Sequence, residues 1–182
     1  MYIALTGTPG TGKTTAARLL PYKVIDINAL VKDGLNFGLD PCRGCLEADM
    51  EGLGKRLKEQ YSEEICILEG HLSHHFADRS IVLRLDPAVL RLRLEARGYS
   101  HEKTRENLEA EALDVILVEA VEQCHRVDEI DTTGRTPQEV ANLITKIIEG
   151  EIDLPPGQVD WMYYIEQRHP SFFTARLSST TM

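Results

Sequence analysis

The sequence GTPGTGKT at residues 7–14 constrains the fold of this chain more than any other feature. It fits the pattern G-x-x-x-x-G-K-[ST] at every position, and it lies between a short apolar run, YIALT, and a segment with alanine and leucine at helical spacing. This order of strand, glycine-rich loop and helix forms a cradle in which backbone N–H groups and the helix N-terminus surround a phosphate group. The sequence therefore predicts a phosphate-binding loop after the first strand.

Individual residues of this loop have distinct expected roles. Gly10 and Gly12 allow the backbone to turn its N–H groups inward without a side chain in the way. Lys13 can reach the β- and γ-phosphates of a nucleotide, and the Thr14 hydroxyl can ligate Mg²⁺. We therefore expect ATP and Mg²⁺ to bind here.

Strands and helices alternate along the rest of the chain. Apolar runs predict further strands, and apolar residues at helical spacing between charged ones predict helices. Such an alternation is typical of an α/β fold, here with a five-stranded parallel sheet and helices on both faces. The predicted strands are 2–6, 24–27, 65–68, 81–85 and 126–130, and the predicted helices are 14–20, 46–61, 87–96, 103–124 and 137–147.

The chain has 182 residues, of which 42% are apolar, and this suffices for one compact domain with small insertions. We place that domain at residues 1–150. An irregular stretch rich in glycine and proline lies within 26–53 and is interpreted as an insertion. The tail, 151–182, contains the only tryptophan and either packs on the domain or serves a partner.

The charge of the chain excludes some partners. A formal net charge of −9 argues against general binding of DNA or of an anionic membrane, since both require a cationic surface. The sequence contains no uninterrupted apolar run of membrane-spanning length and no signal-peptide pattern at its start. We expect a soluble protein of the cytoplasm.

Two polar residues follow the predicted strand 65–68. Glu69 is expected to act with Thr14 at the magnesium site. His71 could position or deprotonate a water, or it could be an ordinary polar loop residue. His74 and His75 are interpreted mainly as loop residues, with a three-histidine metal site as the less favoured alternative.

A cationic connector, ARGYSHEKTR, lies between two predicted helices and is interpreted as a small lid at 96–106. Its cations Arg97, Lys103 and Arg105 could stabilise a transferring phosphoryl group. A solvated connector is the alternative interpretation. Arg91 and Arg93 on the preceding helix could point toward the site or away from it.

Taken together, these motifs resemble the archaeal and nuclear adenylate kinases of the isoenzyme-six family, which are also described as ribosome-assembly ATPases. The matching stretches lie within residues 1–150. They are TGTPGTGKTT, the sequence Glu69-Gly70-His71, LRLEARGY followed by ENLEAE, and IDTTGRTPQEV. This family usually has aspartate where Glu69 stands, so the carboxylate here is displaced by about one methylene.

The resemblance implies a nucleoside monophosphate kinase fold and a set of contacts. The 26–53 insertion would bind the monophosphate. His71 would belong to the motif linked to ATP hydrolysis and to release of a small-subunit ribosomal protein. The ATP contacts would be Gly10, Gly12, Lys13, Thr14 and Thr15 at the phosphates, Arg97 in the lid and Arg135 near adenine.

The resemblance also implies two activities. The first is reversible phosphoryl transfer from MgATP to AMP; beside the resemblance, a related acceptor such as CMP, dephospho-coenzyme A or a sugar-like alcohol is the alternative. The second is an ATP-gated assembly factor that binds a basic ribosomal protein. Acceptor-dependent turnover would distinguish them, because only a kinase is accelerated by AMP.

The four cysteines are interpreted as ordinary reduced thiols. Cys42 and Cys45 form a C-x-x-C pair, which is half of a structural zinc site, so a redox switch or a shared metal is the alternative. Cys66 and Cys124 fall in a strand-like and a helical run.

Overall fold

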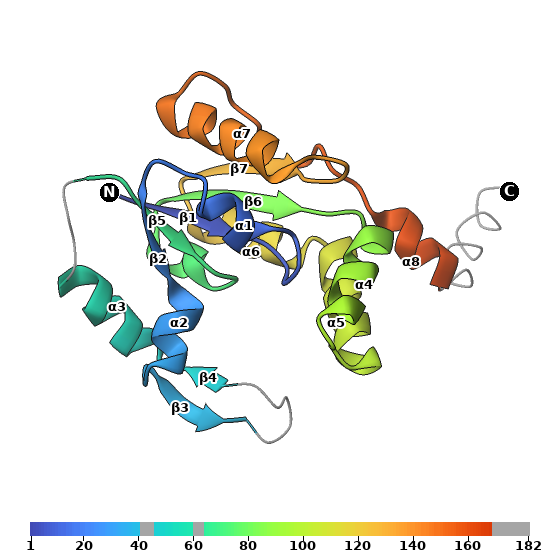
Figure 1. Ribbon diagram of the computed structural model, residues 1–182, viewed down its shortest axis with the longest axis horizontal. Helices are drawn as coiled ribbons and strands as arrows, with labels where there is room; N and C mark the ends of the chain where they lie inside the picture. The colour runs from blue at the N-terminus through green and yellow to red at the C-terminus, as the bar shows by residue number, and fades with distance from the viewer. Residues whose placement is uncertain (41–45, 60–63, 169–182) are drawn as a thin grey trace, which may run out of the picture.

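The computed structural model describes residues 1–40, 46–59 and 64–168 and is built around a five-stranded parallel sheet (Figure 1). The strands lie in the order β2-β5-β1-β6-β7. Helices cover both faces, which confirms the predicted α/β architecture. The strand bounds are β1 Tyr2–Thr6, β2 Lys23–Asp26, β5 Cys66–Glu69, β6 Arg79–Arg84 and β7 Arg126–Asp131.

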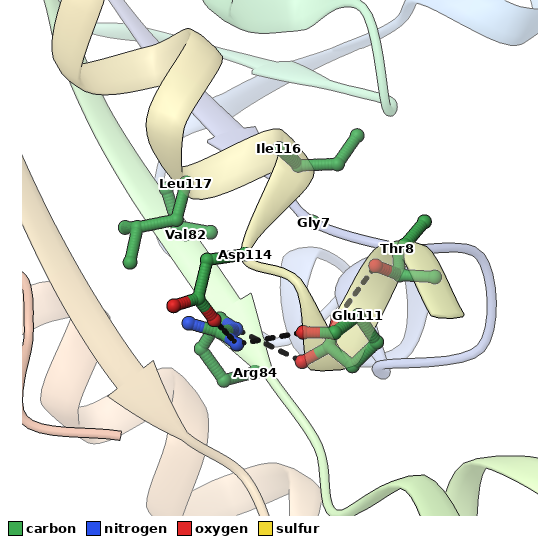
Figure 2. Close-up of a pocket in the computed structure, with 9 residues that line it drawn as sticks. Gly7, Thr8, Val82, Arg84, Glu111, Asp114, Ile116 and Leu117 are labelled. Carbon is green, nitrogen blue, oxygen red and sulfur yellow. Dashed lines mark hydrogen bonds and ion pairs between the residues drawn. The ribbon is translucent and has the colours of Figure 1, made fainter. Parts of the chain in front are cut away.

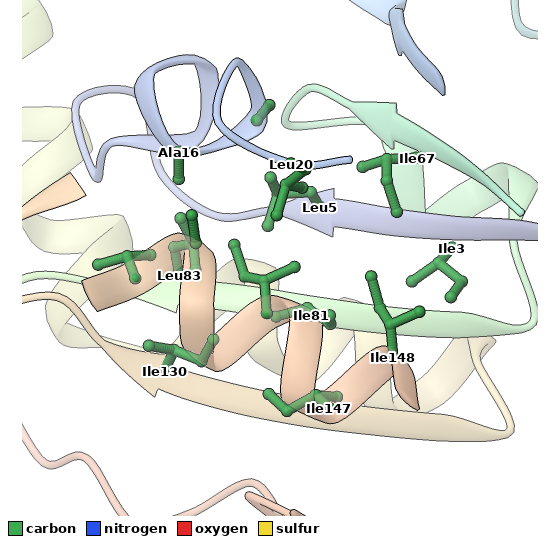
Figure 3. Packing of buried hydrophobic residues seen from close by; sticks show 14 residues of the cluster. Ile3, Leu5, Ala16, Leu20, Ile67, Ile81, Leu83, Ile130, Ile147 and Ile148 are labelled. Atoms are coloured by element: carbon green, nitrogen blue, oxygen red, sulfur yellow. The ribbon is translucent and has the colours of Figure 1, made fainter. Parts of the chain in front are cut away.

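The main core lies between the sheet and two helices, α1 (Lys13–Ala17) and α7 (Pro137–Glu149). Alternate strand residues point to the same face of a sheet, so Ile3 and Leu5 face these helices together with Ile81 of β6 (Figure 3). On the other face Val82 packs against α6, which explains why the strands read as continuous apolar runs.

The strand order places the functional loops side by side. β1 lies between β5 and β6, so the loop after β1 emerges between the carboxyl ends of these two strands. Thr6, Glu69 and Arg84 are the last residues of β1, β5 and β6. In sheets of this type ligands bind at the carboxyl ends of the strands, next to such crossovers.

The predicted helix 46–61 was wrong in its first part. Residues Leu46–Ala48 form a short strand, β4, that pairs antiparallel with β3 (Asn36–Leu39). The helix α3 begins only at Met50, since the Asp49 carboxylate accepts a hydrogen bond from the Gly52 N–H at 2.8 Å and so caps the helix. α3 ends at Glu59, and α2 (Ile27–Lys32) completes the insertion between β2 and β5.

The predicted helix 103–124 was wrong in its continuity. It is divided into α5 (His101–Ala112) and α6 (Val115–Gln123) at Asp114, which has the left-handed φ of 57°. A non-glycine residue adopts this conformation at a cost, and the Asp114 carboxylate offsets it by pairing with Arg84. The division redirects α6 onto the sheet.

The remaining helices include α4 (Pro87–Ala96), the short 3₁₀ helix η1 (Ser73–Phe76) and α8 (Met162–Arg168). α4 begins at Pro87 behind the cap residue Asp86, which agrees with the predicted helix 87–96. α7 begins with a capping box of Thr136 and Glu139. None of the helices in the described ranges combines the length and apolar composition needed to cross a bilayer.

The described part of the tail packs on the rest of the protein. The backbone N–H groups of 157–159 surround one carboxylate oxygen of Glu129 on β7, at 2.8 to 3.4 Å. Farther along, α8 lies beside α4 (Figure 1), and Tyr164 on α8 is buried with apolar side chains of α4 and α5. The domain limits 1–150 and 151–182 stay predictions.

Candidate functional site

The loop after β1 has the backbone that its glycines predict. Gly7 and Gly10 have φ values of +133° and +103°, which side chains rarely allow. A Cβ atom on Gly7 would lie 2.3 Å from the Leu83 carbonyl oxygen, and one on Gly10 would lie 2.6 Å from a methyl group of Leu90. Because these two glycines have no side chains, the loop can lie close against β6 and α4.

Lys13 lies inside this loop and is buried. Its ammonium group donates hydrogen bonds to the carbonyl oxygens of Gly7, at 2.8 Å, and Thr8, at 3.0 Å. Burial lowers the pKa of Lys13 to about 8, although the carboxylates of Glu69 and Glu111 oppose the shift. Two backbone carbonyl groups of the loop thus position the Lys13 ammonium group, which can contact a phosphate bound in the loop.

Thr14 and Glu69 come together as expected for a magnesium site. The Thr14 hydroxyl donates to Glu69 Oε1 at 3.2 Å, joining the start of α1 to the end of β5. Burial raises the pKa of Glu69, and the charge of Lys13 opposes this shift. Both groups present oxygen atoms, the ligands that Mg²⁺ prefers, so the donor set fits this ion.

His71 lies in the loop after β5, two residues beyond Glu69. Burial lowers the pKa of His71, and the nearby charges of Lys13, His75 and Lys103 lower it further. The imidazole is therefore neutral at neutral pH and able to accept a proton. The backbone of the same loop is fixed, since the His71 carbonyl accepts from the Thr6 hydroxyl at 3.2 Å.

The structure decides between the two arginines of α4. Arg93 Nη1 donates to the Gly10 carbonyl oxygen at 3.1 Å, so this guanidinium lies on the phosphate-binding loop. Arg91 instead lies over the Tyr164 ring, 5.9 Å from its centroid. Of the predicted lid cations, Arg97 is exposed at the end of α4, close enough for its charge to lower the pKa of Lys13.

Other predicted contacts lie at the edges of the site. Thr15 is exposed on α1, behind Thr14. Arg135 is also exposed and donates to the Asp131 carbonyl oxygen at 2.9 Å. Its loop adjoins the phosphate-binding loop, because the Thr132 hydroxyl contacts the Thr11 carbonyl oxygen at 3.1 Å. Cys42 and Cys45 lie outside the described residues.

A buried network of charged side chains contacts the phosphate-binding loop at Thr8 (Figure 2). This network was not predicted from the sequence. Arg84 at the end of β6 pairs with Glu111 at 2.9 Å, with Glu129 at 2.6 Å and with Asp114. The second carboxylate oxygen of Glu111 accepts a hydrogen bond from the Thr8 hydroxyl. An arginine inside the apolar run IVLRL was the only local signal, because its partners lie far away in sequence.

A comparison with protein families identifies the loop and its surroundings. The family described as the AAA domain matches residues 3–114. The chain is 48% identical over 178 residues to the "Putative adenylate kinase" of Methanosarcina barkeri, covering 89% of this chain and 98% of the relative. It is 52% identical over 166 residues to a protein of the same name from Methanothermobacter thermautotrophicus, covering 87% of this chain and 96% of the relative.

Solved structures share the fold at low sequence identity. Thymidylate kinase from Candida albicans has a TM-score of 0.52 and 15% identity, over 82% of this chain and 91% of that chain. Deoxyadenosine kinase from M. mycoides has a TM-score of 0.50 and 16% identity, over 82% of this chain and 100% of that chain. The predicted nucleoside monophosphate kinase fold is confirmed. The chain belongs to the P-loop family described as the AAA domain and, with its archaeal relatives, to a nucleoside monophosphate kinase-like family.

Proposed function

We propose that this protein is an adenylate kinase that transfers the γ-phosphoryl group of MgATP to AMP and yields two ADP. The observation that carries the proposal is the meeting of Thr14, Glu69 and Arg93 around the loop that holds Lys13. The names of the archaeal relatives support the choice of acceptor. We place this activity in the cytoplasm.

The donor side follows from the charges of the loop. Gly10, Gly12 and Thr15 would contact the phosphates through the backbone at the start of α1, and Lys13 would pair with the β- and γ-phosphates. Arg93 lies in the last turn of α4, and Arg97 is the cap residue that directly follows this helix. Both can stabilise charge on the transferring group.

Thr14 and Glu69 would hold Mg²⁺, Thr14 through its hydroxyl and Glu69 through its carboxylate or a bound water. When bound, the ion neutralises charge on the β- and γ-phosphate oxygens. Arg135 would lie near the adenine ring, beside the loop that Thr132 ties to Thr11.

The acceptor would bind in the insertion formed by α2, β3, β4 and α3. Lys32 at the end of α2 is a cation of this region that can pair with a monophosphate. The predicted lid, 96–106, comprises the end of α4, the turn after it and the first half of α5. Its movement over the site would exclude water, so that AMP competes successfully against hydrolysis.

A second candidate function is ATP hydrolysis coupled to release of a basic small-subunit ribosomal protein. The specific observation in its favour is the lowered pKa of His71 near the charge of Lys13, because a neutral imidazole can activate water. The net charge of −9 also favours a basic partner. The two functions are compatible in one protein.

The test is turnover of MgATP by the full chain with and without AMP, CMP, GMP and dephospho-coenzyme A, with ADP and free phosphate measured separately. Lys13→Ala serves as the inactive control, and it should retain less than a tenth of the activity. Strong AMP-dependent formation of ADP without free phosphate is the expected result.

Other outcomes redirect the assignment. Preference for a different acceptor would replace AMP with that compound. Slow phosphate release that no acceptor changes would favour the assembly ATPase. Full activity of Lys13→Ala would overturn both functions, since both require the phosphate-binding loop.

A further inference from the structure

A cluster of three potential metal ligands lies between η1 and α6, away from the residues assigned above to ATP and Mg²⁺. It consists of His74 and His75 from η1 and Glu119 from α6. One nitrogen from each imidazole and one carboxylate oxygen all lie within 4.8 Å of one another. His74 is buried with 1% exposure, whereas His75 is exposed and the Glu119 side chain is 45% exposed.

The two contacts of the Thr6 hydroxyl favour one tautomer of His74. The Thr6 hydroxyl lies 3.2 Å from the His71 carbonyl oxygen and 3.3 Å from His74 Nδ1. A hydroxyl has one proton, and a carbonyl oxygen can only accept. When Thr6 donates to His71, His74 Nδ1 must carry a proton and donate to Thr6, which leaves Nε2 as a bare lone pair.

His74 Nε2 is then a buried acceptor that faces another acceptor. It lies 3.4 Å from Glu119 Oε2, without hydrogen-bond geometry, and it has no hydrogen-bond partner among the described residues. A buried polar atom without a partner destabilises the folded protein, because it has lost its hydrogen bonds to water. A cation between the imidazole and the carboxylate would remove this cost.

We propose that His74, His75 and Glu119 form a binding site for Zn²⁺ or a closely similar transition-metal ion. Two imidazoles and one carboxylate are a common ligand set for zinc, whereas Mg²⁺ prefers oxygen ligands alone. The bond from Nδ1 to Thr6 is the type of outer contact that orients a metal-bound histidine.

The distances require only small movements. Zinc ligands at about 2.0–2.2 Å from the ion lie roughly 3.3 Å from one another in a tetrahedron. His74 Nε2 and Glu119 Oε2 already have this separation at 3.4 Å. His75 is exposed and can rotate inward to complete three protein ligands, which leaves the fourth position for water.

The site also has a connection to the phosphate-binding loop. Thr6 directly precedes Gly7, and its hydroxyl links His74 to the backbone of His71. An ion bound to Nε2 would fix the His74 tautomer that donates from Nδ1 to the Thr6 hydroxyl, and the Thr6 hydroxyl would then donate to the His71 carbonyl oxygen. Metal binding would therefore stabilise the loop that carries His71.

The test measures binding of Zn²⁺ by calorimetry and of Co²⁺ by visible absorption to the full chain, dialysed against chelator and free of nucleotide. The background is Cys42→Ser/Cys45→Ser, so that these thiols do not compete. Glu119→Gln and His75→Gln remove exposed ligands with little effect on folding. Glu122→Gln on the exposed side of α6 is the matched control, and melting without metal checks that each variant folds.

The expected result is one ion per chain, with affinity at least tenfold weaker in Glu119→Gln and in His75→Gln and unchanged in Glu122→Gln. His74→Asn should also lose the ion, since it keeps a donor toward Thr6 but lacks Nε2. Binding that persists in both Glu119→Gln and His75→Gln would overturn the site. So would the absence of stoichiometric binding in the Cys42→Ser/Cys45→Ser background.

Discussion

Arg93 Nη1 donates a hydrogen bond to the Gly10 carbonyl oxygen at 3.1 Å and so connects helix α4 to the phosphate-binding loop across 83 residues of sequence. Arg91, two residues earlier on the same helix, faces Tyr164 instead. Arg93 and Arg91 are suited as a test and its control, because they have the same charge and lie on the same helix but contact different parts of the protein.

We expect Arg93→Ala to lower turnover with MgATP and AMP about 100-fold, since loss of one positioned donor at a transferring group commonly has an effect of this size. Arg91→Ala should remain within about twofold and lose only about 0.5–1 kcal/mol of stability from its aromatic contact. Steady-state kinetics and urea unfolding of both variants check this. Equal losses of activity in Arg93→Ala and Arg91→Ala would mean that these arginines act only through the overall positive charge of α4.

Glu69 is expected to set the magnesium requirement. Glu69→Gln keeps the shape of the side chain but removes the charge beside the Thr14 hydroxyl, so the Mg²⁺ concentration for half-maximal activity should rise about tenfold or more. The Mg²⁺ concentration for half-maximal activity of Glu69→Asp should lie between those of the unchanged protein and Glu69→Gln, because aspartate keeps the charge but is one methylene shorter. A titration of activity with Mg²⁺ measures the shift, with exposed Glu151→Gln as control. An unchanged requirement would remove Glu69 from the metal site.

His71 is expected to separate hydrolysis from transfer. Its neutral imidazole can activate water, while AMP supplies its own phosphate oxygen as the nucleophile. His71→Ala should therefore reduce release of free phosphate about 100-fold and transfer to AMP less than tenfold. Product analysis of one reaction gives both rates, and exposed His125→Ala should change neither. Equal losses in the two rates would mean that His71 is structural.

Arg84 is expected to stabilise the folded protein. Arg84→Met leaves the carboxylates of Glu111, Glu129 and Asp114 without their cation, and such a broken buried pair costs about 3–5 kcal/mol. Urea unfolding at neutral pH measures the change. Arg105→Met is the control, since its ion pair with Glu109 is exposed and worth at most about 1 kcal/mol. A similar small loss in both variants would show that the three carboxylates are accommodated without Arg84.

Several features of the fold could be predicted because they depend on neighbours in the sequence. The glycines of residues 7–14, the apolar runs of the five strands and the capping box of Thr136 and Glu139 each act within a few residues. The predicted roles of Lys13, Thr14 and Glu69 also rest on such short patterns, and the structure brings these three side chains together.

The errors arose where a distant partner overrides the local pattern. The helical periodicity of 103–124 is real, yet the chain breaks at Asp114 because its carboxylate pairs with Arg84 on another element. The segment 46–48 carries the apolar residues of a helix, but pairing with β3 makes it a strand. Propensity is a weak preference, and a tertiary contact can exceed it.

The sequence by itself determined the phosphate-binding loop, the alternation of strands and helices and the family of the chain. The tertiary structure alone decided which arginine of α4 meets Gly10, which carboxylates surround Arg84 and which residues face His74 Nε2. The physical reason is that these side chains interact over about 3 Å but lie tens of residues apart, and only the order of strands in the sheet brings them within that distance.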